Sequence, residues 1–160
     1  MILNTLYASL ATLGFGISFN IKGKNLFIAT IGGGLSWFTY LLLLHFHIAA
    51  ILCYFVAALI CSIFSEIMAR INKTPVTTFI VCGIIPLVPG MGMYNTMLEF
   101  TRGDASLGIS TCLETISIAG AIAVGIALVS SLTKLIFKGM DNRKKKRTLK
   151  QKSNLEKVDE

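Results

Sequence analysis

Long apolar stretches, each separated from the next by a short polar or charged connection, make up most of this chain. The stretches approach or exceed the roughly 20 residues that a helix needs to cross the hydrocarbon core of a bilayer. The pattern therefore predicts an all-α integral membrane protein with five transmembrane helices. The five segments are residues 2–21, 26–44, 48–69, 77–100 and part of 106–137.

The composition supports a membrane protein and gives no sign of an enzyme. With 54% hydrophobic residues, the chain of 160 residues is too apolar for an ordinary soluble domain. Its four cysteines lie in apolar runs, without a C-x-x-C pair or a histidine at ligand spacing, so we expect neither zinc nor disulfides. No nucleophile–base pair or phosphate-binding loop can be recognised, and we expect no catalytic residue, cofactor or metal. The acidic residues before Met140 are Glu66, Glu99, Asp104 and Glu114.

The basic residues of the short connections predict the orientation, because cytoplasmic loops are enriched in Lys and Arg. The first connection carries Lys22 and Lys24 and the third carries Arg70 and Lys73, whereas the second has no Lys or Arg and the fourth has only Arg102. Five crossings then place the N-terminus outside and the C-terminus in the cytoplasm of a multi-pass plasma-membrane protein. A fourth segment that dipped in and returned would put the basic tail outside, so we expect it to cross completely.

The C-terminal residues 138–160 differ in composition from the rest of the chain. They hold nine of its fifteen Lys and Arg residues and too little apolar surface to form a core. We therefore divide the chain into a five-helix membrane domain, residues 1–137, and a basic, disordered cytoplasmic tail, residues 138–160. The tail either only anchors the topology or also contacts anionic lipid headgroups. Because the other basic residues punctuate hydrophobic segments, we do not expect nucleic-acid binding.

The fourth segment, residues 77–100, is interrupted by two prolines and two glycines. Proline removes a backbone donor and clashes with the preceding turn, and lipid tolerates such a break only where the freed groups face protein or a water-filled cavity. About ten residues precede the break, which is about half of a roughly 30 Å hydrocarbon core, so we expect it near the midplane. Transporters build substrate sites from such broken helices. The alternative is a kink needed only for packing.

The half-helix that begins near Gly90 would direct unpaired N–H groups and a positive dipole end toward the break, an environment suited to a carboxylate. Gly90 and Gly92 would let a ligand approach the backbone closely, and polar side chains follow on the first turns. The candidate substrate-binding residues of this segment are Pro86, Pro89, Gly90, Met91, Gly92, Tyr94, Asn95 and Thr96.

Glu114 is a further candidate substrate-binding residue, on a polar stripe of the fifth segment. The stripe consists of Ser110, Thr111, Glu114, Thr115 and Ser117. An ionisable residue within a membrane helix usually faces a cavity or a transport pathway. The segment exceeds the roughly 20 residues needed to span. If the crossing ends at Lys134, Glu114 lies near the outer headgroups instead, and both alternatives stay open.

Other polar and small residues are expected to serve the structure. Glu66 lies four residues before Arg70 and Glu99 three residues before Arg102, which are spacings typical of helical ion pairs. Small residues that recur at four-residue spacing let helix backbones approach closely in lipid. We expect them to pack within the chain rather than at a subunit interface. The pairs are Thr12–Gly16, Gly32–Ser36, Ala119–Ala123 and Ala121–Gly125.

The run Ile85-Pro86-Leu87-Val88-Pro89-Gly90, followed by Tyr94 in a five-segment chain of this size, resembles the threonine/serine exporter (ThrE) family. More closely, it resembles the small, split-subunit, YjjB-like type of that family. The resemblance covers about residues 1–137. It implies a secondary exporter of small amino acids or dicarboxylates. It also implies a larger partner subunit with five helices of its own and a cytoplasmic N-terminal domain.

We therefore interpret the chain as a transporter subunit whose broken fourth helix forms a substrate site shared with a partner. Five is an odd number of crossings, so joining two such units would give the inverted topology of many transporter repeats. The alternative is a membrane scaffold that stabilises or regulates its partner without transporting. A water-accessible break would favour transport, and a fully packed break would favour the scaffold.

Overall fold

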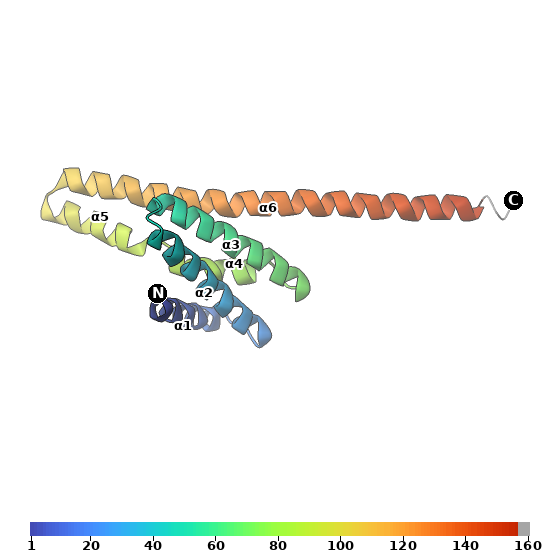
Figure 1. Cartoon of the computed structure of the whole chain (residues 1–160), viewed down its shortest axis with the longest axis horizontal. Coiled ribbons are helices and arrows are strands. Elements are labelled where there is room, and N and C mark those ends of the chain that lie inside the picture. The colour runs from blue at the N-terminus through green and yellow to red at the C-terminus, as the bar shows by residue number, and fades with distance from the viewer. Residues whose placement is uncertain (157–160) are drawn as a thin grey trace.

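The computed structural model describes the backbone of residues 1–156 and the side chains of residues 1–136, and it is helical nearly throughout. The described backbone contains no strand, so the predicted all-α class is confirmed. The elements are α1 (Ile2–Ser18), α2 (Lys24–His45), α3 (Ala50–Ile71), α4 (Thr77–Ile84), the 3₁₀ turn η1 (Ile85–Leu87), α5 (Gly90–Arg102) and α6 (Ala105–Glu156), as Figure 1 shows.

Three helical segments are long and apolar enough to cross a membrane, namely α2, α3 and the part of α6 from Ala105 to Ile136. The bent pair formed by α4 with η1 and by α5 is a fourth candidate if it crosses as one span. Helix α1 has 17 residues, or about 26 Å at 1.5 Å per residue, slightly less than a roughly 30 Å core. The structure thus contains three to four clear candidates, and the predicted fifth depends on α1.

Helix α2 lies at the centre of the first four helices and packs against α1, α3 and α4 (Figure 1). The close approach depends on small residues, because a Cβ added at Gly33 would lie 2.7 Å from Cβ of the buried Thr12. The hydroxyl of Ser36 donates to the carbonyl of Gly83 at 2.8 Å and ties α2 to α4. Thr12, Gly16, Gly32 and Ser36 are all buried, so their predicted packing within the chain is confirmed.

Helix α6 joins this bundle through α3. A Cβ added at Gly125 would lie 3.2 Å from the carbonyl oxygen of Phe55, so the two helices are close. Beside this contact, Leu87 of η1 is completely buried in one cluster with residues of α3 and α6. The buried members of the cluster are Ala57, Ala58, Leu87, Ile118 and Ile122.

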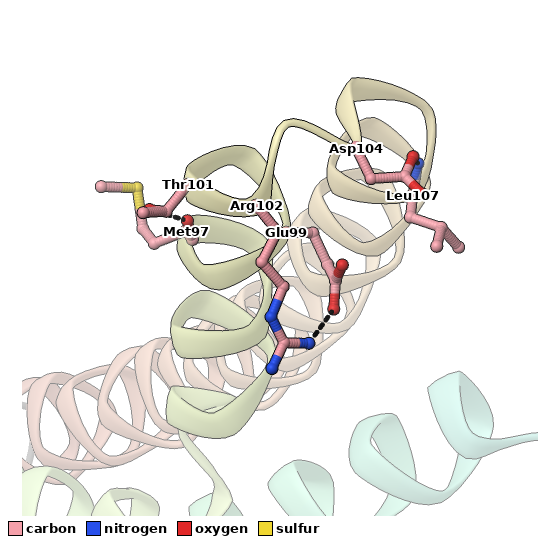
Figure 2. Close-up of polar contacts among 6 residues, drawn as sticks. All are labelled: Met97, Glu99, Thr101, Arg102, Asp104 and Leu107. Atoms are coloured by element: carbon pink, nitrogen blue, oxygen red, sulfur yellow. Dashed lines mark hydrogen bonds and ion pairs between the residues drawn. The ribbon is translucent and has the colours of Figure 1, made fainter.

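Helices α5 and α6 form a hairpin that extends beyond the loop joining α2 to α3 (Figure 1). Within the described part of the chain, α5 packs against α6 and against no other helix. The turn is closed by Gly103 at φ 85° and by Asp104, whose carboxylate accepts the N–H of Leu107 at 3.0 Å (Figure 2).

The two predicted ion pairs are present. Glu99 pairs with Arg102 at 3.6 Å at the tip of the hairpin (Figure 2), and Glu66 pairs with Arg70 at 3.2 Å on α3. Each pair joins two residues of one helix that lie three or four positions apart. This spacing places both side chains on the same face of any helix, so the pairs could be predicted from the sequence.

The side chains of the predicted tail, residues 138–160, lie outside the described part of the structure. The backbone of α6 continues as helix to Glu156, while the side chains after residue 136 and the backbone after residue 156 are not among those described. The division at residue 137, the disorder of the tail and its contact with anionic lipid stay predictions.

Candidate functional site

The chain is broken between α4 and α5 as the prolines require. Helix α4 tightens into η1 around Pro86, which has no N–H to continue the ladder, and Val88 is extended at φ −59° and ψ 126°. Pro89, at φ −77° and ψ 57°, occupies the centre of an inverse γ-turn in which the N–H of Gly90 donates to the carbonyl of Val88 at 2.7 Å. The helices on either side are bent by 47°.

A cavity of about 320 Å³ opens at this break, between the bundle and the hairpin. Helices α2 and α3 each contribute an aromatic residue, and the break, α5 and α6 supply the rest. The cavity therefore brings together residues that lie up to 81 positions apart in the sequence, from Trp37 to Ile118. Its lining residues are Trp37, Tyr54, Pro86, Val88, Pro89, Gly90, Met91, Gly92, Asn95, Thr111, Glu114, Thr115 and Ile118.

Most of the residues predicted from the sequence line this cavity, including Glu114 from the fifth segment. Tyr94 and Thr96 are not among its lining residues. The Tyr94 side chain is exposed on the outside of the hairpin. Thr96 is buried, and its hydroxyl donates to the carbonyl of Gly92 at 2.8 Å within α5.

The first turn of α5 leaves free donors at the cavity. The N–H of Gly90 is used by the γ-turn, and the N–H of Met93 donates to the carbonyl of Pro89 at 3.2 Å. The N–H groups of Met91 and Gly92 fall between these bonds and have no acceptor in the described part of the chain, as expected at a helix start without a side-chain cap. The positive end of the helix dipole adds to their attraction for an anion.

Among the described residues, Glu114 is the only carboxylate that lines the cavity, no Lys or Arg lines it, and Glu114 itself is exposed. It follows the half-buried Thr111 by one turn and precedes the buried Thr115, whose hydroxyl donates to the Thr111 carbonyl at 2.7 Å. Thr115 also faces Gly92, because a Cβ added at Gly92 would collide with its side chain. Glu114 and the start of α5 are therefore held on adjoining walls.

The sequence reasoning missed the aromatic wall. Trp37 and Tyr54 line the cavity, and the ring of Tyr40 contacts both at tilted angles, with centroids 5.1 Å from Trp37 and 4.5 Å from Tyr54. One signal was available, because Trp and Tyr in membrane proteins concentrate at the interfaces, whereas Trp37 lies eight residues before the end of α2. An aromatic residue so far from a helix end is a reason to suspect an internal site.

A second hollow, of about 340 Å³, lies on the other side of Trp37 and Pro86, which line both. It is lined mainly by α1, and its polar side chains are Asn4 and Tyr7. None of the described charged side chains lines it, so it offers fewer contacts to a polar ligand than the cavity at the break does. No three His, Cys, Asp or Glu residues gather at a possible metal site within the described residues.

Helices long and apolar enough to cross a bilayer, packed around a small cavity, define a multi-pass membrane protein. Residues 4–132 match the model of the family described as "Threonine/Serine exporter, ThrE". The chain therefore belongs to the threonine/serine exporter family, a family of transporters, as its resemblance to that family predicted.

One similar protein is an uncharacterized protein of Haemophilus influenzae (strain ATCC 51907 / DSM 11121 / KW20 / Rd). It is 28% identical to the chain over 136 residues. The alignment covers 80% of this chain and 46% of that protein, so the chain spans about half the length of this relative. No solved structure matches the chain significantly.

Proposed function

We propose that this chain is a subunit of a secondary transporter that exports small amino acids, with threonine and serine as the type substrates, or dicarboxylates. The substrate site is the cavity at the break. One observation carries the proposal: the free N-terminus of α5 and Glu114 line the same cavity of about 320 Å³. This volume lies at the small end of the roughly 300–1,000 Å³ typical of ligand pockets, which suits a small solute.

The bond between Ser36 and Gly83 supports a position of the break near the midplane. Ser36 lies close to the middle of α2, which runs from Lys24 to His45, and Gly83 is bonded to it three residues before Pro86. In the proposed topology α1 and the bent α4–α5 pair both cross, giving five spans with the N-terminus outside and the C-terminus in the cytoplasm. The basic connections at Lys22–Lys24 and at Arg70–Lys73 then share the cytoplasmic side with the tail.

The proposal includes a partner subunit with five helices of its own and a cytoplasmic N-terminal domain. Two observations support it. The chain spans only 46% of a single-chain relative, which leaves room there for a second unit of similar size. In the described part of the chain helix α5 packs on α6 alone, and several of its apolar side chains are exposed. Apart from Met91, which lines the cavity, the exposed set is Met93, Tyr94, Met97 and Phe100. A second unit packed there would close the cavity and give the inverted repeat of other transporters.

Valine substitution at Gly90 tests the site. A Cβ at Gly90 meets no atom within 4 Å, so the larger side chain enters open space and leaves the packing intact. We expect Gly90→Val to abolish export of radiolabelled threonine from proteoliposomes that contain the chain and its partner, because valine obstructs the approach to the α5 N-terminus.

Gly120→Val is the matched control. Gly120 also meets no atom within 4 Å, but it lies on α6 away from the cavity, so export should continue. Equal amounts of each variant in the membrane would show that insertion is unchanged. Normal export by Gly90→Val would mean that the break is a packing kink, and it would favour the alternative that the chain is a scaffold for its partner.

A further inference from the structure

We propose that the α1 hollow binds one acyl chain of a membrane lipid, which packs against Trp37 and Pro86 on the side away from the cavity at the break. The α1 hollow is the hollow of about 340 Å³ that shares only these two residues with the cavity. The inference goes beyond the proposed function and does not depend on transport. The lining residues of the α1 hollow are Asn4, Tyr7, Ala8, Ala11, Trp37 and Pro86.

The walls of the α1 hollow are apolar over most of their length. Ala8 and Ala11 lie one turn apart on α1, and their small side chains leave a space that is closed by Trp37 of α2 and Pro86 of η1. None of the described charged side chains lines this space. A charged solute would lose its hydration there without finding a counter-charge, so the lining favours a hydrocarbon.

The α1 hollow follows the direction of an acyl chain within one leaflet. Asn4 lies near the start of α1, and Ala11 follows it by about 10 Å at 1.5 Å per residue. A Cβ added at Gly33 would contact Thr12, so Ala11 lies level with the middle of α2. One leaflet contributes about 15 Å of a roughly 30 Å core, so the hollow runs along about two-thirds of it.

The polar side chains of the α1 hollow lie at the end where a lipid would have its polar groups. Asn4 and Tyr7 are on the first two turns of α1, and both side chains are exposed. The Asn4 amide and the Tyr7 hydroxyl can donate hydrogen bonds to ester or phosphate oxygens, as Tyr does at membrane interfaces. The apolar part of the hollow continues from them toward the middle of the helices.

The volume of the α1 hollow excludes a helix of another subunit as its occupant. One turn of an α-helix, about 10–12 Å wide and 5.4 Å long, takes up about 420–610 Å³. The hollow of about 340 Å³ is smaller, whereas an unbranched hydrocarbon chain can bend to its shape. Lipid chains surround every spanning helix, and an apolar hollow left empty would forfeit the dispersion contacts of its walls.

The bound chain would contact the back of a wall of the cavity at the break. Trp37 and Pro86 line both spaces, and the ring of Tyr40 contacts Trp37 with the centroids 5.1 Å apart. Trp37 is only half-buried, so the protein leaves part of the indole to whatever fills the two spaces. The acyl chain therefore supports the indole on a side that the protein leaves open.

Quenching by brominated lipids tests the site, because bromine quenches tryptophan fluorescence on contact and Trp37 is the single tryptophan of the chain. The purified full-length chain is placed in nanodiscs of phosphatidylcholine that is unbrominated, brominated near the methyl end of an acyl chain, or brominated near the headgroup. We expect the bromines near the methyl end to quench about twofold more strongly, because Trp37 lies near the middle of α2 and hence at the deep end of the hollow.

Filling the hollow separates this site from general contact with lipid. Ala11→Phe places a ring in the hollow, and we expect quenching by the bromines near the methyl end to fall at least about twofold, because the displaced chain no longer comes within about 4.5 Å of Trp37. Leu10→Phe is the matched control, since Leu10 is the exposed neighbour of Ala11 but does not line the hollow. It should be quenched like the wild type.

Three outcomes would overturn the inference. No quenching of the wild type by either brominated lipid would mean that water or side chains of another subunit fill the hollow. Stronger quenching by the bromines near the headgroup would contradict the depth assigned to Trp37. Equal quenching of Ala11→Phe and the wild type would mean that Trp37 meets lipid elsewhere.

If Ala11→Phe does not insert into the membrane, the smaller change Ala11→Leu takes its place, with the same expected direction. Absence of threonine export by the reconstituted complex would refute the proposed function and leave the quenching result, and this inference, unchanged.

Discussion

The bundle formed by α1 to α4 and the hairpin formed by α5 and α6 are built in opposite ways. In the bundle, glycines and hydroxyl residues let α2 lie directly against its neighbours, and Thr12, Ser36 and Phe79 are almost completely buried. In the hairpin, α5 has a single neighbour, and its outward side chains are among the most exposed in the described part of the chain. The cavity lies where the two regions meet.

This difference gives the two regions different roles. Lipid supplies no hydrophobic drive between helices, so close van der Waals contact and hydrogen bonds hold a membrane bundle together. The bundle has both and can serve as a rigid wall that carries Trp37 and Tyr54. Helix α6 is held to the bundle through α3, whereas α5 packs against α6 alone in the described part of the chain, so α5 is the element able to move or to receive a partner. A cavity between a rigid and a loosely held wall can change shape without unfolding either one.

The largest effect is expected from Gly33→Val in the bundle. A Cβ at this position would lie 2.7 Å from both Cβ and Cγ2 of Thr12, a buried side chain that cannot move aside. Overpacking of this kind costs about 1–3 kcal/mol or more. We expect loss of monodisperse protein in size-exclusion chromatography of detergent extracts.

Gly14→Val is the control for this prediction, because a Cβ at Gly14 meets no atom within 4 Å. It should elute like the wild type. A normal profile for Gly33→Val would show that α1 can move away from α2 at little cost, and the contrast between a tight bundle and a loose hairpin would be wrong.

An intermediate effect is expected from Gly92→Ala in the hairpin. The added methyl group collides with Thr115, so α5 must move away from α6 or Thr115 must change rotamer. Because α5 has no other neighbour among the described residues, we expect it to shift at a cost of about 1–3 kcal/mol, with the bundle intact and export reduced. Thermal unfolding and the proteoliposome assay measure the two effects.

Thr115→Ala should rescue Gly92→Ala, since it removes the two closest atoms of the collision, Oγ1 and Cγ2. The double variant would then be more stable than the sum of the single changes predicts, which is the sign of a direct contact in a double-mutant cycle. Strict additivity would argue against the contact between α5 and α6 at this point.

The smallest effect is expected from Ser36→Ala. It deletes the hydroxyl that lies 2.8 Å from the carbonyls of both Gly83, on α4, and Gly33, within α2, and it leaves the rest of the bundle's packing in place. One such bond contributes about 0.5–1.5 kcal/mol, so the unfolding temperature should fall by a few degrees. Thr30→Ala is the comparison, because Thr30 bonds only within α2, to the carbonyl of Leu26 at 2.9 Å, and should matter less.

The sequence by itself determined the features that depend on local backbone chemistry. The helical class and the pairs Glu66–Arg70 and Glu99–Arg102 were predicted from residues a few positions apart and are present, whereas a transmembrane helix broken at Pro86 and Pro89 near the midplane stays a prediction. Proline cannot donate, and residues three or four apart share a helix face wherever the helix packs. The motif of the break also indicated the family, which the match over residues 4–132 confirms.

Only the tertiary structure decided which faces of the helices meet. It brought Trp37 and Tyr54 to the cavity, left Tyr94 and Thr96 out of it, and limited α5 to a single neighbour. A membrane helix that is apolar on every side gives little sign of its buried face, because lipid and protein neighbours are equally apolar. Close packing around glycines and serines decides which face of the helix is buried. That packing depends on the partner helix as much as on the local sequence.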